Sequence, residues 1–314
     1  MSRLSRRNGC IACKRPRAPG GVRRFCSRYM EDYLFVAPYT LLFFVFTVIP
    51  VGASLLLSLT NWNVLETPVF VGLKNYFKLF LEDSIFVLAL KNTLLISLIT
   101  GPVSFFLSLF VAWLVNEFDP KLRTLLTLLF YAPSLSGGVY LVWQIILSND
   151  SNGLLNALLM DLNIVYEPVL WTTNPKYMFV SCIAVVLWMS LGTSFLSFIA
   201  GFQNVDRTLY EAGAVDGLRN RWQELWYITL PSMRPQLMFG AVMSITGSFG
   251  IGDVISGIFG FPSTNYSLHT LVHHLQDYGN IRFEMGYASA IATILFLIML
   301  VSNQLVQRLL AKLG

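Results

Sequence analysis

The sequence has few charged residues for its length. Only 12% of its 314 residues are Asp, Glu, Lys or Arg, whereas 55% are hydrophobic. An average soluble domain carries about 25% charged residues, so the composition excludes an ordinary soluble protein. Six long stretches almost lack charge, and a membrane-spanning helix needs about 20 apolar residues. The sequence therefore predicts an all-α, polytopic membrane protein with six transmembrane helices, near residues 34–59, 87–116, 123–147, 177–202, 236–257 and 286–308.

The basic residues that are present gather in alternate loops. Nine Lys or Arg residues precede Tyr33, and eight more lie in the loops after the second and fourth spans and at the C-terminus. The remaining loops hold five. Because loops rich in Lys and Arg stay in the cytoplasm, we expect both termini and the loop 203–235 there. The net charge of +5 then reflects topology, and we expect no nucleic-acid partner.

Two parts of the chain differ in composition. Residues 1–30 form a basic tail rich in Gly and Pro, and residues 31–314 form the six-span transmembrane domain in the lipid bilayer. The first apolar run is much longer than the 7–15 apolar residues of a signal peptide, so we expect a retained span. The tail contains Cys10, Cys13 and Cys26, which we interpret as reduced thiols because a structural zinc site needs four ligands.

The cytoplasmic loop 205–235 has the pattern of two short helices. Asp206 is a suitable N-cap for the first helix, which should run to about Val215. Asp216 and Gly217 follow, and Gly217 can adopt the left-handed conformation that ends a helix.

The second helix of this loop should begin at Asn220. Gln223 lies three residues on, in the arrangement of a capping box, and Pro231 should mark the end. Large apolar side chains and Thr229 recur at i, i+3, i+4 and i+7, which places them on one helical face. That face consists of Trp222, Leu225, Trp226 and Thr229. We expect the helix pair to offer a surface to a partner protein.

A spaced motif runs through the same loop: Glu211-Ala212-Gly213, then Gly217, then Ile228-Thr229-Leu230-Pro231. It resembles the EAA coupling loop of ABC importer permeases, and the flanking residues resemble the carbohydrate branch of that family. Two features depart from the family pattern. Gly213 replaces an alanine, and ten residues separate Gly217 from Ile228 where the family usually has nine. The extra residue is predicted at the turn between the two helices.

The resemblance covers most of the chain beyond the tail, and it implies the type I ABC importer permease fold in a bacterial cytoplasmic membrane. It further implies three kinds of partner: a cytoplasmic ABC ATPase dimer, a second homologous permease and an extracytoplasmic solute-binding protein. ATP would be hydrolysed on the ATPase subunits, so this chain is not expected to be an enzyme. The implied ATPase-coupling residues are Glu211, Ala212, Gly213, Asp216, Gly217, Trp222, Leu225, Trp226, Ile228, Leu230 and Pro231.

Motifs for nucleotide binding, metal binding and catalysis are missing. The run Leu135–Gly138 reads LSGG, like the signature of ABC ATPases, but no Walker A pattern accompanies it. We interpret the run as small residues that let helices approach closely. No HExxH pattern is present. We therefore expect no catalytic residue, cofactor or metal, and we expect His269, His273 and His274 to lie in an exposed outer loop.

A solute path is expected among the spans, where small and hydroxyl-bearing residues are frequent. Packing explains most of these residues, because small side chains let helices lie close together. The alternative is a lined cavity, with aromatic faces available to stack on sugar rings. The candidate path residues are Trp143, Trp188, Thr193, Ser194, Ser244, Thr246, Ser248 and Asp253.

Two other functions remain open. One is an ABC importer permease for a solute that is not a sugar, which would share the coupling loop. The other is a channel or secondary carrier outside the ABC class. A secondary carrier would be expected to show inverted repeats or paired intramembrane ionisable residues, and neither is evident in the sequence.

Overall fold

The computed structural model describes residues 30–312, in two units that divide between Ala53 and Ser54. Almost all of the predicted tail, with its three cysteines, lies outside the described residues. The first unit holds α2 (Met30–Phe43), a π-helical turn (Phe44–Val48) and the beginning of α3 (Ile49–Leu57). The helix Tyr33–Leu57 is long and apolar enough to cross a membrane, as its charge-free sequence predicts.

Five further stretches of the second unit have the length and hydropathy of membrane spans. Two are single helices, α5 (Ser84–Asn116) and α17 (Met285–Lys312). Three are bent pairs: α6 (Pro120–Leu135) with α7 (Tyr140–Ile146), α9 (Pro175–Met189) with α10 (Thr193–Asn204), and α14 (Arg234–Phe249) with α15 (Gly252–Phe259). If each pair is one span, the described residues contain the six predicted spans.

The bends in these spans were not predicted from the sequence. The angles are 89° between α6 and α7, 41° between α9 and α10, and 42° between α14 and α15. The first bend falls on the LSGG run, where Ser136 has an extended backbone. A Cβ atom added to Gly137 would meet nothing within 4 Å. The interpretation of this run as a close helix contact is therefore wrong, because it forms the break between two helices.

Short elements connect the spans. On the predicted outer side, β1 (Thr60–Asn61) pairs antiparallel with β2 (Val69–Phe70), with Thr60 opposite Phe70. The other outer elements are α4 (Lys74–Leu81), α8 (Leu154–Asp161), a 3₁₀ turn (Thr264–Tyr266), α16 (Leu271–Gln276) and a π-turn (Asp277–Ile281). The loop between the fourth and fifth spans contains α11 (Arg207–Val215), α12 (Arg221–Glu224), a π-turn (Leu225–Thr229) and α13 (Leu230–Ser232).

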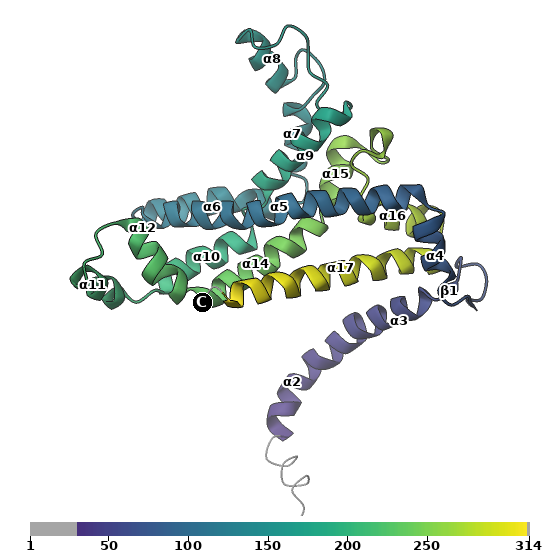
Figure 1. Ribbon diagram of the computed structural model, residues 1–314, viewed down its shortest axis with the longest axis horizontal. Coiled ribbons are helices and arrows are strands. Elements are labelled where there is room, and N and C mark those ends of the chain that lie inside the picture. Colours follow the sequence, from purple (N-terminus) through teal and green to yellow (C-terminus); the bar gives the residue numbers. More distant parts are fainter. Residues whose placement is uncertain (1–29, 313–314) are drawn as a thin grey trace, which may run out of the picture. The chain divides into compact units, whose positions relative to one another are not determined.

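The centre of the second unit is a helix bundle. Helix α14 packs against α5, α10 and α17, and α10 also packs against α5 (Figure 1). The α10–α14 contact is close because Gly240 of α14 abuts the ring of Phe198, where a Cβ atom would overlap the ring. Helices α11 and α12 lie at one end of this bundle, and α4 and α16 lie at the other (Figure 1). The loop 205–235 and the outer elements α4 and α16 therefore lie at opposite ends of the bundle (Figure 1).

Candidate coupling segment and intramembrane cavity

The first helix of the loop, α11, has the predicted ends. The Asp206 carboxylate accepts a hydrogen bond from the Thr208 N–H at 3.0 Å, and this bond lowers the pKa of Asp206. At the other end, Gly217 has a φ of +93°. The Leu218 N–H donates to the Gly213 carbonyl at 2.9 Å, and the Gly217 N–H donates to the Ala214 carbonyl at 3.3 Å. These two bonds form a Schellman motif, so the predicted cap and stop are both confirmed.

The second helix differs from its prediction at both ends. Asn220 is the N-cap, but its side chain makes no capping hydrogen bond. The Gln223 side chain instead accepts from the Arg219 N–H at 2.9 Å, one residue before the position that a capping box uses. The helix also continues past Pro231 and breaks at Met233. The predicted capping box and end point are therefore wrong.

A π-turn over Leu225–Thr229 interrupts this second helix. The N–H of Leu230 donates to the carbonyl of Leu225, which is the i→i+5 pattern of a π-helix. Such a turn holds one residue more than an α-helical turn. It therefore offers a place inside the helix for the one extra residue between Gly217 and Ile228, which the sequence analysis assigned to the inter-helix turn.

The π-turn also divides the predicted apolar face. Leu225 and Thr229 are only 7% and 4% exposed, whereas Trp222 and Trp226 are 60% and 66% exposed. Leu225 belongs to a core cluster with residues of α5 and α10. The Trp222 ring packs on the ring of Trp113, at the end of α5, with 5.0 Å between centroids. Leu225 and Thr229 thus hold the segment to its own bundle, whereas Trp226 and the exposed side of Trp222 remain available to a partner.

A surface hollow of about 580 Å³ lies between α11 and the second helix. Glu211 and Ala212 are exposed, while Gly213 is buried. A Cβ atom at Gly213 would lie 2.6 Å from the Ile228 side chain and 2.8 Å from that of Leu218, which gives a steric reason for glycine where the family has alanine. The hollow is lined by Leu209, Ala212, Gly213, Asp216, Leu218, Tyr227, Ile228, Pro231 and Ser232.

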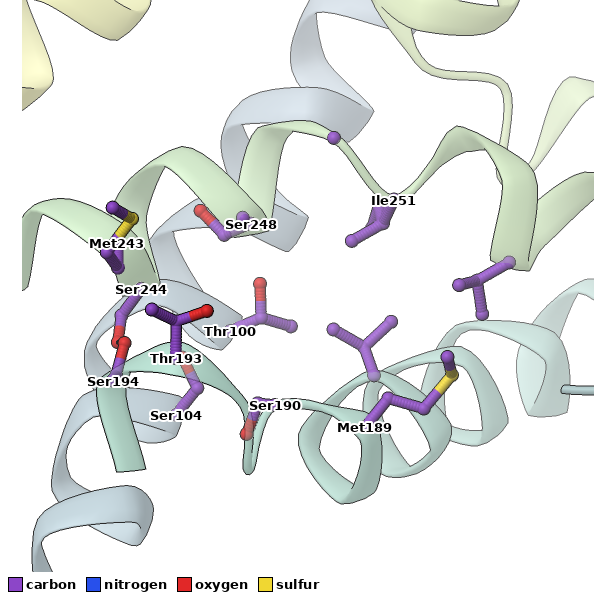
Figure 2. Close-up of a pocket in the computed structure, with 14 residues that line it drawn as sticks. Thr100, Ser104, Met189, Ser190, Thr193, Ser194, Met243, Ser244, Ser248 and Ile251 are labelled. Atoms are coloured by element: carbon purple, nitrogen blue, oxygen red, sulfur yellow. The ribbon is translucent and has the colours of Figure 1, made fainter. Parts of the chain in front are cut away.

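A second cavity, of about 290 Å³, lies between the spans (Figure 2). It forms where the bent pairs break, at Ser190–Gly192 and at Gly250–Ile251. Backbone irregularity within a membrane protein is tolerated where it lines a cavity. The hydroxyl-bearing residues of the lining are Thr100, Ser104, Ser190, Thr193, Ser194, Ser244 and Ser248. The other lining residues are Val186, Met189, Met243, Gly247, Gly250, Ile251 and Val254.

Half of the predicted path residues lie in this lining, namely Thr193, Ser194, Ser244 and Ser248. The other four lie elsewhere. Trp143 and Trp188 pack edge to face, 5.5 Å between centroids, the Thr246 hydroxyl accepts from Asn303 at 3.4 Å, and Asp253 is exposed outside the lining.

Three hydroxyl-bearing residues of the lining were not among the predicted path residues. Thr100 and Ser104 of α5 flank Gly101-Pro102, and Ser190 ends α9. A hydroxyl beside a Gly-Pro pair in an apolar span was the available signal.

The three outer histidines are buried, so their prediction as an exposed loop is wrong. His269, His273 and His274 are each 3% exposed or less. His274 Nε2 lies 3.0 Å from the carboxylate of Asp83, which also accepts a hydrogen bond from Tyr287 at 2.9 Å. His273 bonds to Thr270 at 2.7 Å in a capping box of α16. Among the described residues, no group of His, Cys, Asp and Glu could hold a metal ion.

Burial sets the charge state of these histidines. It lowers the pKa of His269 to about 3 and the pKa of His273 to about 4. Burial also lowers the pKa of His274, although the Asp83 carboxylate opposes this shift. The three side chains are therefore neutral at physiological pH. His274 joins α16 to Asp83, the N-cap of α5, and His273 joins it to Gly252 and Ser256 of α15.

Comparison with known proteins identifies the family of this chain. The family described as "Binding-protein-dependent transport system inner membrane component" matches residues 104–314. The chain belongs to this family. The matched region of this transport component contains the whole cavity except Thr100, and the whole helix pair of loop 205–235.

Relatives of this transport component include ABC transporter permeases. It is 34% identical over 297 residues to "Probable ABC transporter permease protein YesP" of Bacillus subtilis, covering 93% of this chain and 92% of the relative. It is 30% identical over 280 residues to "Arabinooligosaccharides transport system permease protein AraP" of Bacillus subtilis, covering 88% of this chain and 87% of the relative. The resemblance of the sequence to ABC importer permeases is thereby confirmed.

The fold of the chain also matches a solved transporter. A chain in the crystal structure of a bacterial ABC transporter involved in the import of the acidic polysaccharide alginate superposes with a TM-score of 0.73 at 22% identity. The match covers 91% of this chain and 98% of the other. The predicted all-α importer permease fold is confirmed.

Proposed function

We propose that this chain is one permease subunit of an ATP-driven importer, and that it translocates a sugar or oligosaccharide delivered by an external binding protein. The family description supports the dependence on a binding protein, and the relative named for arabinooligosaccharides supports a sugar. The observation that carries the proposal is the arrangement of two sites in one bundle: a cavity of hydroxyl groups between the spans, and an exposed helix pair at one end (Figure 1).

The chain connects these two sites directly. Only Val205 and Asp206 separate α11 from α10, which carries Thr193 and Ser194 of the cavity. Met233 alone separates α13 from α14, which carries Ser244 and Ser248. A displacement of the helix pair is therefore transmitted to two walls of the cavity. In this proposal, closure of an ATPase dimer moves the helix pair, and rigid-body tilting of the spans switches the cavity between the two membrane sides.

The residues of the helix pair divide into two roles. Glu211, exposed and in no ion pair within residues 30–312, is proposed to pair with a basic residue of the ATPase. Trp226 and the hollow beside Gly213 supply apolar contact area for the ATPase. Leu225 is buried in the permease, so we propose that it anchors the helix pair to the bundle instead of touching the ATPase. Gly217 provides the left-handed turn between the helices.

The remaining partners follow from the same proposal. The cavity is lined by α5, α9, α10, α14 and α15 of one chain, and we propose that a second, homologous permease completes the enclosure of the solute. Two ATPase subunits bind and hydrolyse ATP. The chain lies in a bacterial cytoplasmic membrane, with both termini and the helix pair in the cytoplasm.

The proposal is tested by purifying the chain with its co-purifying subunits and reconstituting the complex with its binding protein in proteoliposomes. We expect an ATPase to co-purify, and we expect radiolabelled arabinooligosaccharides or another saccharide to accumulate only when ATP is present. Uptake driven by an ion gradient without an ATPase would support the secondary-carrier alternative. ATP-driven uptake of peptides or polyamines, but of no saccharide, would support a permease for another solute.

A further inference from the structure

The cavity between the spans has no ionisable side chain in its lining, which consists of seven hydroxyl-bearing residues, two glycines and five apolar side chains. A charged solute in such a site would lose hydration without gaining an opposite charge, which is costly in a low-dielectric region. An anion could still be held by hydrogen-bond donors alone, as happens at many phosphate sites. The orientation of the hydroxyl groups therefore decides which solute the cavity favours.

Most of these hydroxyl groups donate their proton to the backbone of their own helix. The acceptor is the carbonyl three or four residues earlier, and the oxygen–oxygen distances lie between 2.6 and 3.0 Å. The four groups are Thr100 to Ile96, Ser104 to Gly101, Ser190 to Leu187, and Ser248 to Ile245. A hydroxyl oxygen has two further lone pairs, so each of these groups retains its capacity to accept.

The remaining three hydroxyl groups add one donor. Ser194 donates to the Gly240 carbonyl at 3.1 Å, and its oxygen lies 3.1 Å from that of Ser244. Because the Ser194 proton is used, Ser244 is the donor in this pair. Thr193 makes no hydrogen bond with any residue of 30–312. Figure 2 shows these side chains around the same space as Thr100 and Ser248, so the cavity offers many acceptors and a single hydroxyl donor.

The helix ends at the cavity do not add a net charge of either sign. Helices α10 and α15 begin there, which brings partial positive charge, and helices α9 and α14 end there, which brings partial negative charge. Each terminus carries about half an elementary charge. With two termini of each sign around one cavity, these contributions cancel to first order.

We infer that this cavity binds an uncharged, hydroxyl-rich group, such as one ring of a neutral saccharide, and disfavours carboxylated, phosphorylated or sulfonated sugars. The hydroxyls of a neutral sugar donate to the serine and threonine oxygens, whereas an anion finds one hydroxyl donor and no side chain of opposite charge. A volume of about 290 Å³ is at the lower end of small-molecule sites, roughly 300–1,000 Å³, which fits one ring at a time. The inference rests on the proposed importer function. The neutral solute inferred for this chain differs from that of the alginate importer, whose polysaccharide is acidic.

The inference is tested by measuring the charge preference of the cavity without the binding protein. The four cysteines of the chain are replaced by serine, and Ser244→Cys is introduced in the intact complex. The thiol is reacted with methanethiosulfonate reagents that carry a neutral hydroxyethyl, a cationic trimethylammonium-ethyl or an anionic sulfonatoethyl group. Rates are divided by those with free cysteine. Thr246→Cys, two residues away and facing Asn303 instead of the cavity, is the matched control.

We expect the neutral reagent to modify Ser244→Cys faster than Thr246→Cys, and the anionic reagent to react with Ser244→Cys at least about 10-fold more slowly than the neutral one. Thr193→Cys, which replaces a hydroxyl with no hydrogen bond in the described chain, is a second variant should Ser244→Cys fail to assemble. An anionic rate equal to the neutral rate would overturn the charge preference, although ATP-driven saccharide uptake could still stand. If the neutral reagent failed to modify Ser244→Cys both with and without ATP, the cavity would not be part of the solute path. Charge preference without any saccharide uptake would overturn the proposed function instead.

Discussion

The buried histidines of the predicted outer side make the stability of that region depend on pH. The folded pKa values are about 3 for His269 and about 4 for His273, against about 6.5 in an unfolded chain. Because the folded values are the lower ones, the open or unfolded segment binds protons first as pH falls. Stability is therefore complete above pH 6.5 and is lost progressively between pH 6.5 and about 3.

The size of this effect follows from the difference between the two pKa values. At pH 5, an unfolded histidine is mostly protonated while these two are not, and each favours the open state by about 2 kcal/mol. Together they remove up to about 4 kcal/mol, a large part of the roughly 5–15 kcal/mol that stabilises a typical protein. The folded pKa values already include the attraction of a protonated His273 to Asp253 and of a protonated His269 to Asp83, so these carboxylates do not change the figure.

Hydrogen exchange of the segment 263–281, followed by mass spectrometry at pH 7.5 and pH 5.0, measures the effect. After correction for intrinsic exchange, the free energy of opening should fall by up to about 4 kcal/mol at pH 5.0, while peptides of α10 and α14 keep their protection. The variant His273→Gln, which has no proton to gain in this range, should show about half of the pH dependence. Protection that is the same at both pH values would refute the assignment of buried, neutral histidines.

Three further predictions concern the helix pair and the bundle. Glu211→Lys should leave membrane insertion intact but reduce uptake per ATP hydrolysed by about 10-fold or more, as measured in proteoliposomes; normal uptake would remove the proposed role of Glu211. Leu225→Ala should destabilise the purified permease by about 2–5 kcal/mol. Trp226→Ala, at an exposed position, should change the stability by less than about 0.5 kcal/mol and should weaken ATPase binding. Equal thermal shifts for the two variants would contradict the division of the helix face into a buried and an exposed half. Gly240→Ala should cost about 1–3 kcal/mol because its Cβ overlaps the Phe198 ring, and an unchanged melting temperature would show that the two helices can separate at no cost.

The spans and the end of α11 could be predicted because their causes are local. A charge-free run of the length of α5 or α17 has few alternatives to a membrane helix, and Asp206 and Gly217 act on hydrogen bonds within a few residues of themselves. The breaks inside three spans escaped prediction because hydropathy is continuous across Gly192 and Gly250. Whether a glycine packs, bends or does neither depends on its neighbours in space.

The errors at the sites have a similar origin. The histidines were expected to be exposed because nothing near them in sequence explains burial. Their partner Asp83 lies 191 residues before His274, and only the packing of α16 on α5 brings the two together. The aromatic residues Trp143 and Trp188 were assigned to the solute path for their chemistry, but they pack on each other instead. The π-turn at Leu225–Thr229 has no sequence signal beyond the spacing of ten residues after Gly217.

In the proposed mechanism, the helix pair transmits ATPase closure to the cavity. The most direct test uses proteoliposomes that contain the complete importer with Ser244→Cys. An impermeant cationic thiol reagent is added to one side of the membrane at a time, with and without ATP trapped on the ATPase. We expect trapped ATP to raise modification from the binding-protein side and to lower it from the opposite side. We expect Glu211→Lys to abolish this change while ATP remains bound. Modification that is unaffected by ATP, or that switches equally well with Glu211→Lys, would contradict this mechanism.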